Sequence, residues 1–360
     1  MSKPRLLILS ASTGNGHMSA AYAVAAEAEI AGMAAEVIDV LDFTSAGFTS
    51  WYRGGYEKLV KDKPAVWGHL YKSSDRPLFN YTFQTGLDYV FTKRVRKAIQ
   101  EFKPDWVICT HSLPQPRLVP LRREFGFRIG IVVTDLYVHR MWLRGRPDYF
   151  FVPQQWSREV LMRRRPSLGK HSLVTGIPIH PVFGEIKFER EWGGEKVALV
   201  SSGGIGGGPL VGAVQQVLDA GWRVKVIAGR NEAVKEDLTM AFGDNQMVEI
   251  FGHIDQNKMA ELMQTCHLLV SKPGGLTTFE SLASGIPFMV YWPFLIPGQE
   301  EGNALFLKDC GAGVIVTEVQ QIESELEYLD VEKLKKMSES GLAQALPHAA
   351  RDIVEALQRL

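Results

Sequence analysis

The chain has 360 residues, of which 46% are hydrophobic and 22% are charged, and its formal net charge at pH 7 is zero. The length fits two domains, and the composition is that of a folded globular protein, which excludes a disordered chain. Three cysteines without a C-x-x-C pair predict neither a disulfide framework nor a zinc site.

The charge is unevenly distributed along the chain. Residues 1–170 contain 25 Lys and Arg against 15 Asp and Glu, and the remaining residues carry the opposite surplus. A basic half indicates an anionic partner such as a phosphate, a nucleic acid or a lipid surface, or else only a solvated face. The longest apolar run, residues 286–297, is too short and too rich in proline to cross a membrane.

In the first half, short apolar runs alternate with helix-length segments. Strands are expected at 5–11, 35–43, 105–111, 128–135 and 148–153. A helix is expected over 19–32, where apolar residues recur at helical spacing. Strands separated by helices indicate a parallel, doubly wound sheet.

The same rhythm restarts after residues 174–183, a connector punctuated by Pro and Gly. Strands or strand–loop units are expected at 196–208, 223–231, 246–254, 267–275 and 286–292. The sequence therefore predicts an α/β protein with two Rossmann-like domains, at 1–178 and 179–335, and a helical tail at 336–360. Ligands of such sheets bind at the carboxyl ends of the strands, so both glycine loops are expected to face a cleft between the domains.

An anion site is predicted where a strand leads into Gly274 and Gly275 and a helix follows. The N–H groups at a helix start and its positive end suit a diphosphate, and Thr277 and Thr278 could add hydroxyl donors. Glu280 could accept hydrogen bonds from a ribose. The same residues also spell T-x-x-E, a capping box that would only close a helix, and spacing favours neither interpretation.

Two further loops of the second half could contact the same ligand. Gln299, Glu300 and Asn303 offer amide and carboxylate groups for sugar hydroxyls, with an i, i+4 pair expected on one helix face. The glycine-rich run 200–208, which includes Gly204, allows close approach to the backbone, although it could be a simple turn. It is not a Walker loop.

The first glycine loop, with Gly14 and Gly16, departs from a dinucleotide fingerprint because Ser19 occupies the third glycine position. Asp39 or Asp42 could still bind a ribose, so a nicotinamide dehydrogenase stays open. His17 at a helix start is expected to have a lowered pKa, and a neutral imidazole is a candidate general base.

Residues 49–77 interleave aromatics, among them Trp51, Tyr52 and Trp67, with Arg and Lys. This pattern is typical of a membrane-interface patch, unless the aromatics form a core. No nucleic-acid-reading module is recognisable, so no nucleic-acid partner is expected. No D-x-D pair or His/Asp cluster appears, so we expect no metal or other cofactor and assign the diphosphate charge to helix ends.

Four ordered motifs, 14–21, 132–143, 174–183 and 272–307, resemble the monogalactosyldiacylglycerol synthase and processive diacylglycerol glucosyltransferase group. This group lies in glycosyltransferase family 28, with the lipid II-forming N-acetylglucosaminyltransferase. The resemblance implies the GT-B fold with a C-terminal helix that returns to the first domain. It also implies an inverting, metal-independent transfer of a hexose from a UDP-sugar to diacylglycerol.

The resemblance assigns donor-side roles to several residues. Gly275 and Thr277 would contact the diphosphate, within a motif that also holds Lys272, and Glu280 would contact the ribose. Gln299 and Glu300 would contact the hexose. Residues 251–254, from Phe251 to Ile254, fall where the family's backbone holds uracil.

On the acceptor side, the resemblance makes His17 the suspected base and Asp135 its rival. His139 and Trp142 belong to a motif at the cleft, and the segment from Trp51 to Tyr71 matches the region thought to meet the membrane. We thus expect a peripheral enzyme of the cytoplasmic membrane face, with UDP-glucose or UDP-galactose, diacylglycerol and an anionic lipid surface as partners. Alternatives are a UDP-GlcNAc transferase for another lipid-linked acceptor, a UDP-sugar sensor and an NAD-binding oxidoreductase.

Overall fold

The computed structural model describes residues 3–13, 16–44, 54–55, 62–76, 88–185, 189–203 and 209–360, without the side chains of 88–91 and 185. Four residues with predicted roles, Gly14, Trp51, Tyr52 and Gly204, lie outside the described residues. The chain divides into two compact units, which are treated separately below. Unit 1 is Met1–Ile179 with His348–Leu360, and unit 2 is His180–Pro347.

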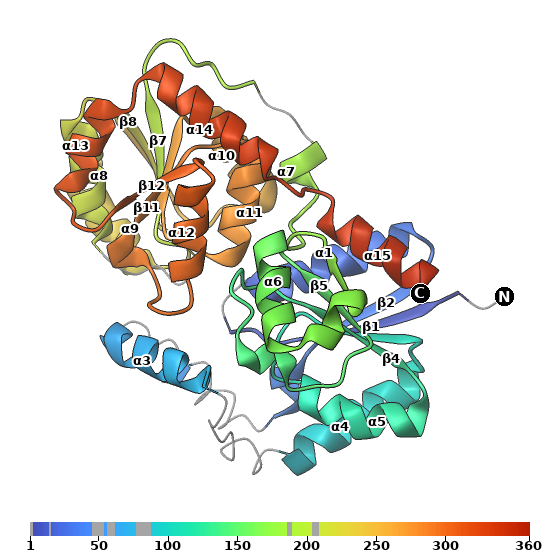
Figure 1. The fold of residues 1–360 in the computed structure, drawn as a ribbon. Coiled ribbons are helices and arrows are strands. Elements are labelled where there is room, and N and C mark those ends of the chain that lie inside the picture. The colour runs from blue at the N-terminus through green and yellow to red at the C-terminus, as the bar shows by residue number, and fades with distance from the viewer. Residues whose placement is uncertain are drawn as a thin grey trace. The chain divides into compact units, whose positions relative to one another are not determined.

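The described part of unit 1 holds six parallel strands in one sheet, in the order β2-β1-β3-β4-β5-β6 (Figure 1). Its elements are β1 Arg5–Ser10, α1 Gly16–Ile30, β2 Ala34–Asp39, η1 Val40–Phe43, α3 Pro64–Ser74, α4 Asp88–Phe102, β3 Trp106–Cys109, α5 Gln115–Phe125, β4 Arg128–Val132, η3 Arg140–Leu143, β5 Tyr149–Val152, α6 Gln155–Arg164, η4 Pro166–His171, β6 Ser172–Val174 and α15 Ala349–Arg359.

The described part of unit 2 holds another six-stranded parallel sheet, in the order β12-β11-β10-β7-β8-β9. Its elements are α7 Val182–Glu185, β7 Val197–Ser201, α8 Leu210–Asp219, β8 Arg223–Ile227, α9 Glu232–Phe242, β9 Val248–Phe251, α10 Gln256–Thr265, β10 Leu268–Ser271, α11 Gly275–Ser284, β11 Phe288–Tyr291, η5 Trp292–Phe294, α12 Glu301–Asp309, β12 Gly313–Val316, α13 Gln321–Tyr328 and α14 Val331–Ala343.

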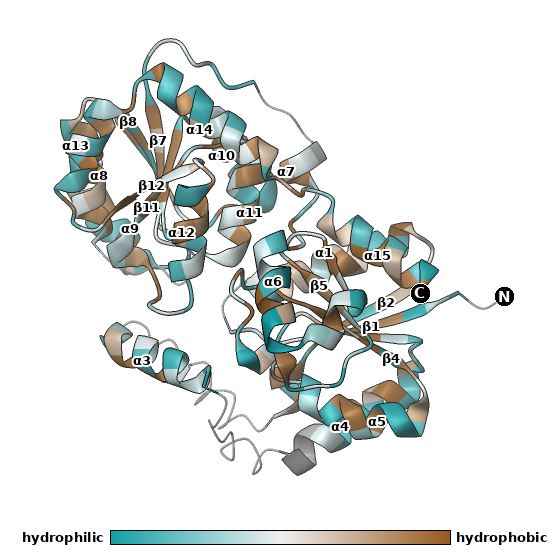
Figure 2. Ribbon diagram, viewed as in Figure 1, coloured by the Kyte–Doolittle hydropathy of each residue, from teal (hydrophilic) through white to brown (hydrophobic). Residues whose placement is uncertain are grey.

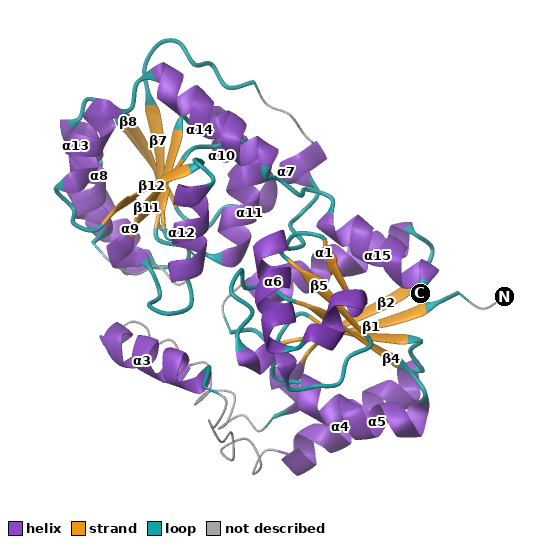
Figure 3. Cartoon of the chain, in the orientation of Figure 1, coloured by secondary structure: helices purple, strands orange, loops and turns teal. Residues whose placement is uncertain are grey.

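Both sheets are covered by helices on their two faces (Figure 3). Strand β1 shows how the sequence produces this arrangement, because its apolar residues alternate between two cores. Leu7 and Leu9 pack with residues of α4, α5 and α6, whereas Leu6 and Ile8 pack with residues of α1 and α15. A strand buried on both faces needs a continuous apolar run, which is why the strands are mostly brown in Figure 2.

Each sheet has one point at which the strand order reverses. In unit 1 this point lies between β1 and β3, and in unit 2 it lies between β7 and β10. Loops after the two strands leave such a point in opposite directions, which opens a crevice at the carboxyl ends of the strands. The topology therefore places one potential ligand site in each unit.

The C-terminal segment divides between the units. Helix α15 packs against α1 in unit 1, where Ile353, Val354 and Leu357 are buried, so the predicted return to the first domain is confirmed. The first part of the predicted tail at 336–360 belongs instead to helix α14, which packs in unit 2. The hydroxyl of Ser338 donates to the carbonyl of Gly285 at 2.6 Å.

Arg190, which lies between α7 and β7, is fixed to two helices of unit 2. Its guanidinium donates to the carbonyls of Met263 and Cys266, at the end of α10, and to those of Ser284 and Gly285, at the end of α11. The negative ends of two helices thus balance a largely buried cation.

Among the described residues, no helix combines the length and the hydropathy needed to cross a membrane.

Candidate active site

His17 lies at the reversal point of the unit 1 sheet, on the first turn of α1. Its Nδ1 is 3.1 Å from the carbonyl oxygen of Thr110, which follows β3, and 2.7 Å from the hydroxyl oxygen of Thr134, which follows β4. The Thr110 hydroxyl donates to the carbonyl of His17 at 3.0 Å. The residue is partly exposed. Loops from three adjacent strands therefore hold its imidazole where ligands of such sheets bind.

These contacts decide which ring nitrogen of His17 carries the proton. A carbonyl oxygen only accepts hydrogen bonds, so a lone pair on Nδ1 would be repelled by Thr110. Nδ1 therefore carries the hydrogen, and the Thr134 hydroxyl can donate to the same carbonyl at 3.4 Å. In this tautomer Nε2 is the basic nitrogen of His17.

Burial lowers the pKa of His17, while the negative charge of Asp135 and the bond to Thr110 partly oppose that shift. The lowered pKa expected from the sequence is thus present, but burial is its main cause rather than the helix end. The imidazole is neutral at neutral pH, as a general base must be before it accepts a proton.

Asp135 and Trp142 join His17 at this site. The indole Nε1 of Trp142 donates to Oδ2 of Asp135 at 2.9 Å, and the Trp142 ring lies 6.4 Å from the His17 ring, centroid to centroid. Trp142 is buried and Asp135 is partly exposed. A fixed carboxylate near His17 would stabilise the imidazolium that forms when Nε2 takes up a proton.

A second histidine, His111, contacts His17 and was missed in the sequence. The two rings meet edge to face, 4.6 Å apart. His111 Nδ1 accepts from the N–H of Leu113 at 3.0 Å, so its Nε2 carries the hydrogen and faces the Thr13 hydroxyl at 3.2 Å. Burial, and then the charge of His17, hold the pKa of His111 well below its usual range. Its position at the end of a predicted strand was the available signal.

His139, expected at the cleft, is fully buried and contacts the chain's own backbone. Its Nδ1 accepts from the N–H of Met141 at 3.1 Å, so Nε2 donates to the carbonyl of Tyr71, also at 3.1 Å. Nε2 thus holds α3 to the loop after β4, while the bond to Nδ1 orders that loop itself. In this structure His139 is a packing residue rather than a contact for an acceptor.

In unit 2, the predicted anion site stands at the reversal point of the sheet. Helix α11 begins at Gly275, with Gly274 as its N-cap and no side chain on the cap position. Its first N–H groups therefore face the carboxyl edge of β10. Gly203, after β7, has a φ of +77°, and a Cβ there would come within 2.7 Å of Lys272 Cε. The positive φ favours glycine at that position.

The capping-box interpretation of Thr277 and Glu280 is wrong. Thr277 is the third residue of α11 and Glu280 is the sixth, in the second turn, because the helix begins earlier than the box requires. Glu280 is 7% exposed, and its carboxylate has no hydrogen-bond partner among the described residues. Burial raises the pKa of Glu280 to about 7. Thr278 is also buried, and its hydroxyl has no partner in the described part of the chain.

The residues predicted to contact the hexose tie two loops together. Glu300 accepts from Lys272 Nζ at 2.7 Å and from the N–H of Ile296 at 2.7 Å. Asn303 donates to the carbonyl of Pro273 at 2.6 Å, and its Oδ1 has no partner among the described residues. Gln299 precedes α12, so the predicted i, i+4 pair on one helix face is wrong. Helix α12 begins at Glu301, with Glu300 in the N-cap position.

The remaining predicted donor residues lie at the other edge of the same sheet. Phe251 ends β9 and is partly exposed, with Lys258 Nζ 5.8 Å from its ring centroid. Ile254 is partly exposed and precedes Asp255, the N-cap of α10. No group of three or more His, Cys, Asp or Glu that could hold a metal ion occurs among the described residues.

Of the aromatic and basic segment, α3 is described. Val66 and Leu70, one turn apart, are 47% and 45% exposed, and Lys63 and Lys72 flank them. Tyr71 is buried, as the core interpretation expected. Helix α3 therefore has one packed face and one exposed face that combines apolar and basic residues.

Comparisons with known proteins bear on both units. Residues 17–179 match the family model of monogalactosyldiacylglycerol (MGDG) synthase. Two similar sequences are processive diacylglycerol beta-glucosyltransferases. The one from Bacillus cereus is 27% identical over 98% of this chain and 93% of its own, and the one from Bacillus pumilus is 28% identical over 98% and 94%. The resemblance seen in four motifs is thus confirmed along almost the whole chain.

Solved structures share the fold at low sequence identity. MurG of Acinetobacter baumannii has a TM-score of 0.65 at 15% identity, over 99% of this chain and 100% of its own. The S. aureus MnaA–UDP co-structure gives 0.67 at 15% identity, over 99% and 96%. The calicheamicin glycosyltransferase CalG4 gives 0.65 at 14% identity, over 100% of both chains. These likenesses confirm the predicted GT-B fold.

Proposed function

We propose that this protein, similar to diacylglycerol glucosyltransferases over 98% of its length, transfers glucose or galactose from a UDP-sugar to the free hydroxyl of diacylglycerol. The transfer inverts the anomeric carbon and needs no metal ion. The observation that carries the proposal is the imidazole of His17, held through Nδ1 by Thr110 and Thr134 so that Nε2 is its basic nitrogen. A base at this position suits the deprotonation of an acceptor hydroxyl.

The donor binds in unit 2 under this proposal. The start of α11 at Gly275 receives the diphosphate, because helix N-termini bind anions through their N–H groups. Glu280 accepts hydrogen bonds from the ribose hydroxyls, which would give its buried carboxylate the partners that the described residues do not supply. Lys272 adds a cation beside the same loop.

The reaction then proceeds in one step. The diacylglycerol hydroxyl oxygen attacks the anomeric carbon, a glycosidic C–O bond forms, and the bond from that carbon to the diphosphate oxygen breaks. UDP leaves with the bonding electron pair, and the helix end at Gly275 stabilises the charge that grows on it. His17 Nε2 takes the hydroxyl proton, and Asp135 stabilises the resulting imidazolium.

The lipid acceptor places the enzyme at a membrane surface. The exposed residues of α3 and its N-cap include the apolar Val66 and Leu70 and the basic Lys63 and Lys72, and this combination suits an interfacial helix on anionic lipid. We therefore propose a peripheral association with the cytoplasmic face of the membrane.

Labelled donors test the proposal. The protein is incubated with diacylglycerol vesicles and radiolabelled UDP-glucose, UDP-galactose or UDP-N-acetylglucosamine, and the lipids are separated. A labelled glycosyldiacylglycerol from one of the two hexose donors is the expected product. Transfer from UDP-N-acetylglucosamine alone would assign a different donor, and no transfer from any of them would refute the activity.

A further inference from the structure

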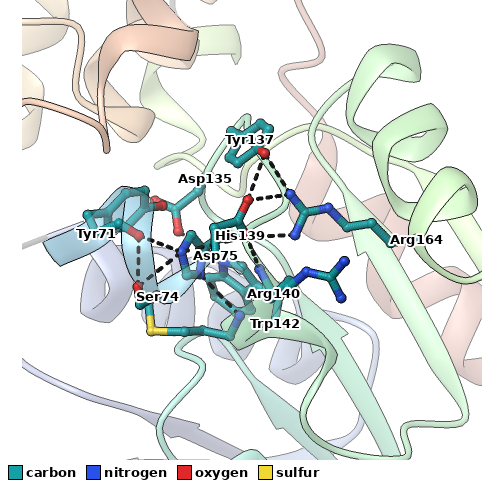
Figure 4. Close-up of polar contacts among 10 residues, drawn as sticks. Tyr71, Ser74, Asp75, Asp135, Tyr137, His139, Arg140, Trp142 and Arg164 are labelled. Carbon is teal, nitrogen blue, oxygen red and sulfur yellow. Dashed lines mark hydrogen bonds and ion pairs between the residues drawn. The ribbon is translucent and has the colours of Figure 1, made fainter. Parts of the chain in front are cut away.

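Asp75 fixes the C-terminal end of α3 to the rest of unit 1. Each of its carboxylate oxygens accepts from a separate guanidinium nitrogen of Arg164, both at 2.6 Å (Figure 4). The Tyr137 hydroxyl donates to Oδ2 and the N–H of Arg140 donates to Oδ1, both at 2.8 Å. The side chains of Asp75 and Arg164 are only 16% and 12% exposed. A shielded, bidentate ion pair of this kind fixes the relative position of the two residues in addition to attracting them.

Two of the residues that donate to Asp75, Tyr137 and Arg140, belong to the loop that reaches His17. Tyr137 and Arg140 lie between Asp135 and Trp142, the two residues of this loop that are joined by a hydrogen bond beside the His17 ring. The ring of His139, in the same loop, lies tilted against that of Tyr71 of α3, with the centroids 4.4 Å apart, and its Nε2 donates to the Tyr71 carbonyl. A continuous series of contacts therefore leads from α3 through this loop to the imidazole.

Helix α3 also has an exposed side that is available to a lipid surface. Val66 and Leu70 lie about half exposed on that face. A lipid-contacting helix must hold its depth and angle relative to the base if a hydroxyl at the membrane surface is to reach Nε2.

We propose that Asp75 is a positioning residue that holds the lipid-side helix α3 in a fixed relation to His17 and Asp135. The proposal rests on the proposed function for the nature of the acceptor. Asp75 acts through Arg164, Tyr137 and Arg140 and does not touch the reacting atoms. Its loss affects acceptors presented in a membrane more than acceptors in solution, because a soluble acceptor does not depend on α3.

The test compares Asp75→Asn with Asp148→Asn. Asp148 also accepts from an arginine through both oxygens, Arg122 at 3.0 and 3.1 Å, and from the N–H of Ile129. It belongs to unit 1 but not to the contacts between α3 and the loop. The control therefore removes the same charge from another aspartate–arginine pair of the same unit, one that is more exposed and uses a single guanidinium nitrogen.

Initial rates are measured with diacylglycerol in anionic vesicles and with monomeric dihexanoylglycerol. For Asp75→Asn we expect kcat/KM to fall by about tenfold or more on vesicles, and to stay within about twofold of wild type on the soluble acceptor. Asp148→Asn should show no difference between acceptors. An equal loss on both acceptors, or no loss on vesicles, would overturn the proposal.

Arg164→Gln provides the second variant. This substitution breaks the Asp75–Arg164 ion pair by changing the residue on α6. The double variant with Asp75→Asn should therefore lose no more kcat/KM on vesicles than either single variant. Additive losses would show that the two residues act separately and would overturn the pairing as the cause.

If the wild-type protein transfers no sugar, the proposed function is refuted, but the role of Asp75 can still be tested by hydrogen exchange. Amides of residues 64–74 should exchange faster in Asp75→Asn than in wild type or Asp148→Asn, while those of α1 stay unchanged. Unaltered exchange over 64–74 would show that Asp75 does not hold α3.

Discussion

His17 and Thr110 are hydrogen-bonded in both directions. The imidazole Nδ1–H points to the Thr110 carbonyl at 3.1 Å, and the Thr110 hydroxyl donates to the His17 carbonyl at 3.0 Å. The first bond fixes the tautomer and the second fixes the backbone that carries the ring. Position and protonation of the proposed base are thus set by the end of β3, a different strand from the one that leads into His17.

His17→Ala should reduce sugar transfer by roughly 10²- to 10⁴-fold, the usual contribution of a general base. UDP affinity measured by calorimetry should stay unchanged, because the proposed donor site lies in unit 2. Near-normal transfer, or lost UDP binding, would contradict the role. Abolished transfer in Asp135→Asn together with active His17→Ala would instead make Asp135 the base.

The pH profile gives an independent measure of the same group. Because the pKa of His17 is lowered, the acid limb of kcat/KM should fall below the usual histidine range. The charge of Asp135 raises that pKa, so Asp135→Asn should move the limb to still lower pH. A limb that stays in place, or moves upward, in this variant would mean that another group controls it.

Thr134→Val removes the shorter of the two contacts to His17 Nδ1 with little change of shape. We expect kcat to fall roughly three- to tenfold, the equivalent of one neutral hydrogen bond, with unchanged UDP affinity. Thr134→Ser, which keeps the hydroxyl, is the matched control and should be near wild type. If both variants lose activity equally, packing rather than the hydrogen bond is responsible.

Glu280→Gln should change how stability depends on pH. The pKa of Glu280 is raised from 4.5 to about 7, so the folded state is progressively penalised as pH rises through that window. The full penalty above pH 7 corresponds to ~3 kcal/mol. In thermal unfolding between pH 5 and 8.5, the melting temperature of the variant should rise relative to that of wild type as the pH increases.

The same substitution should weaken UDP binding, because an amide accepts from ribose hydroxyls less strongly than a carboxylate. Wild-type UDP affinity should increase between about pH 5 and 7, as the carboxylate ionises. A more stable variant with unchanged UDP affinity would leave Glu280 buried but outside the donor site.

The stability contributed by Asp75 should depend on pH in the opposite direction. Despite burial, which alone would raise it, the hydrogen bonds from Arg164, Arg140 and Tyr137 lower the pKa of Asp75 to about 2. The stability that it contributes is therefore present above the unfolded-state value of 3.8 and is lost as pH falls through about 2. The melting temperature of Asp75→Asn should lie below wild type at pH 5 to 7 and converge with it below pH 4. A gap that persists in acid would exclude the carboxylate charge as its source.

The sequence predicted features that depend on local order along the chain. Apolar runs of strand length predicted five of the six strands in each sheet but missed β6 and β12, and the glycines at 274 and 275 marked the start of α11, since such signals involve neighbouring residues. The exact first residue of a helix was less predictable. That small uncertainty made a capping box at Thr277 and Glu280 look as plausible as a ligand site.

What the sequence did not reveal depends on residues that are distant along the chain. Asp75 and Arg164 are 89 positions apart, and neither lies in a recognisable motif. His139 was part of a motif, yet its burial against Tyr71 follows from the docking of α3 and could not be read from spacing. Such partners become visible only once the strand order is known.

Helix α15 has a consequence for how the protein is made. The ribosome produces residues 1–179 before His348–Leu360, which their unit also needs. Until then the apolar side of α1, including Val24 and Ala28, lacks Ile353 and Val354 as its cover. Unit 2 can complete its own core earlier, so the unit that is synthesised first is finished last. The helix that carries His17 acquires its full support only once residues 348–360 have been synthesised.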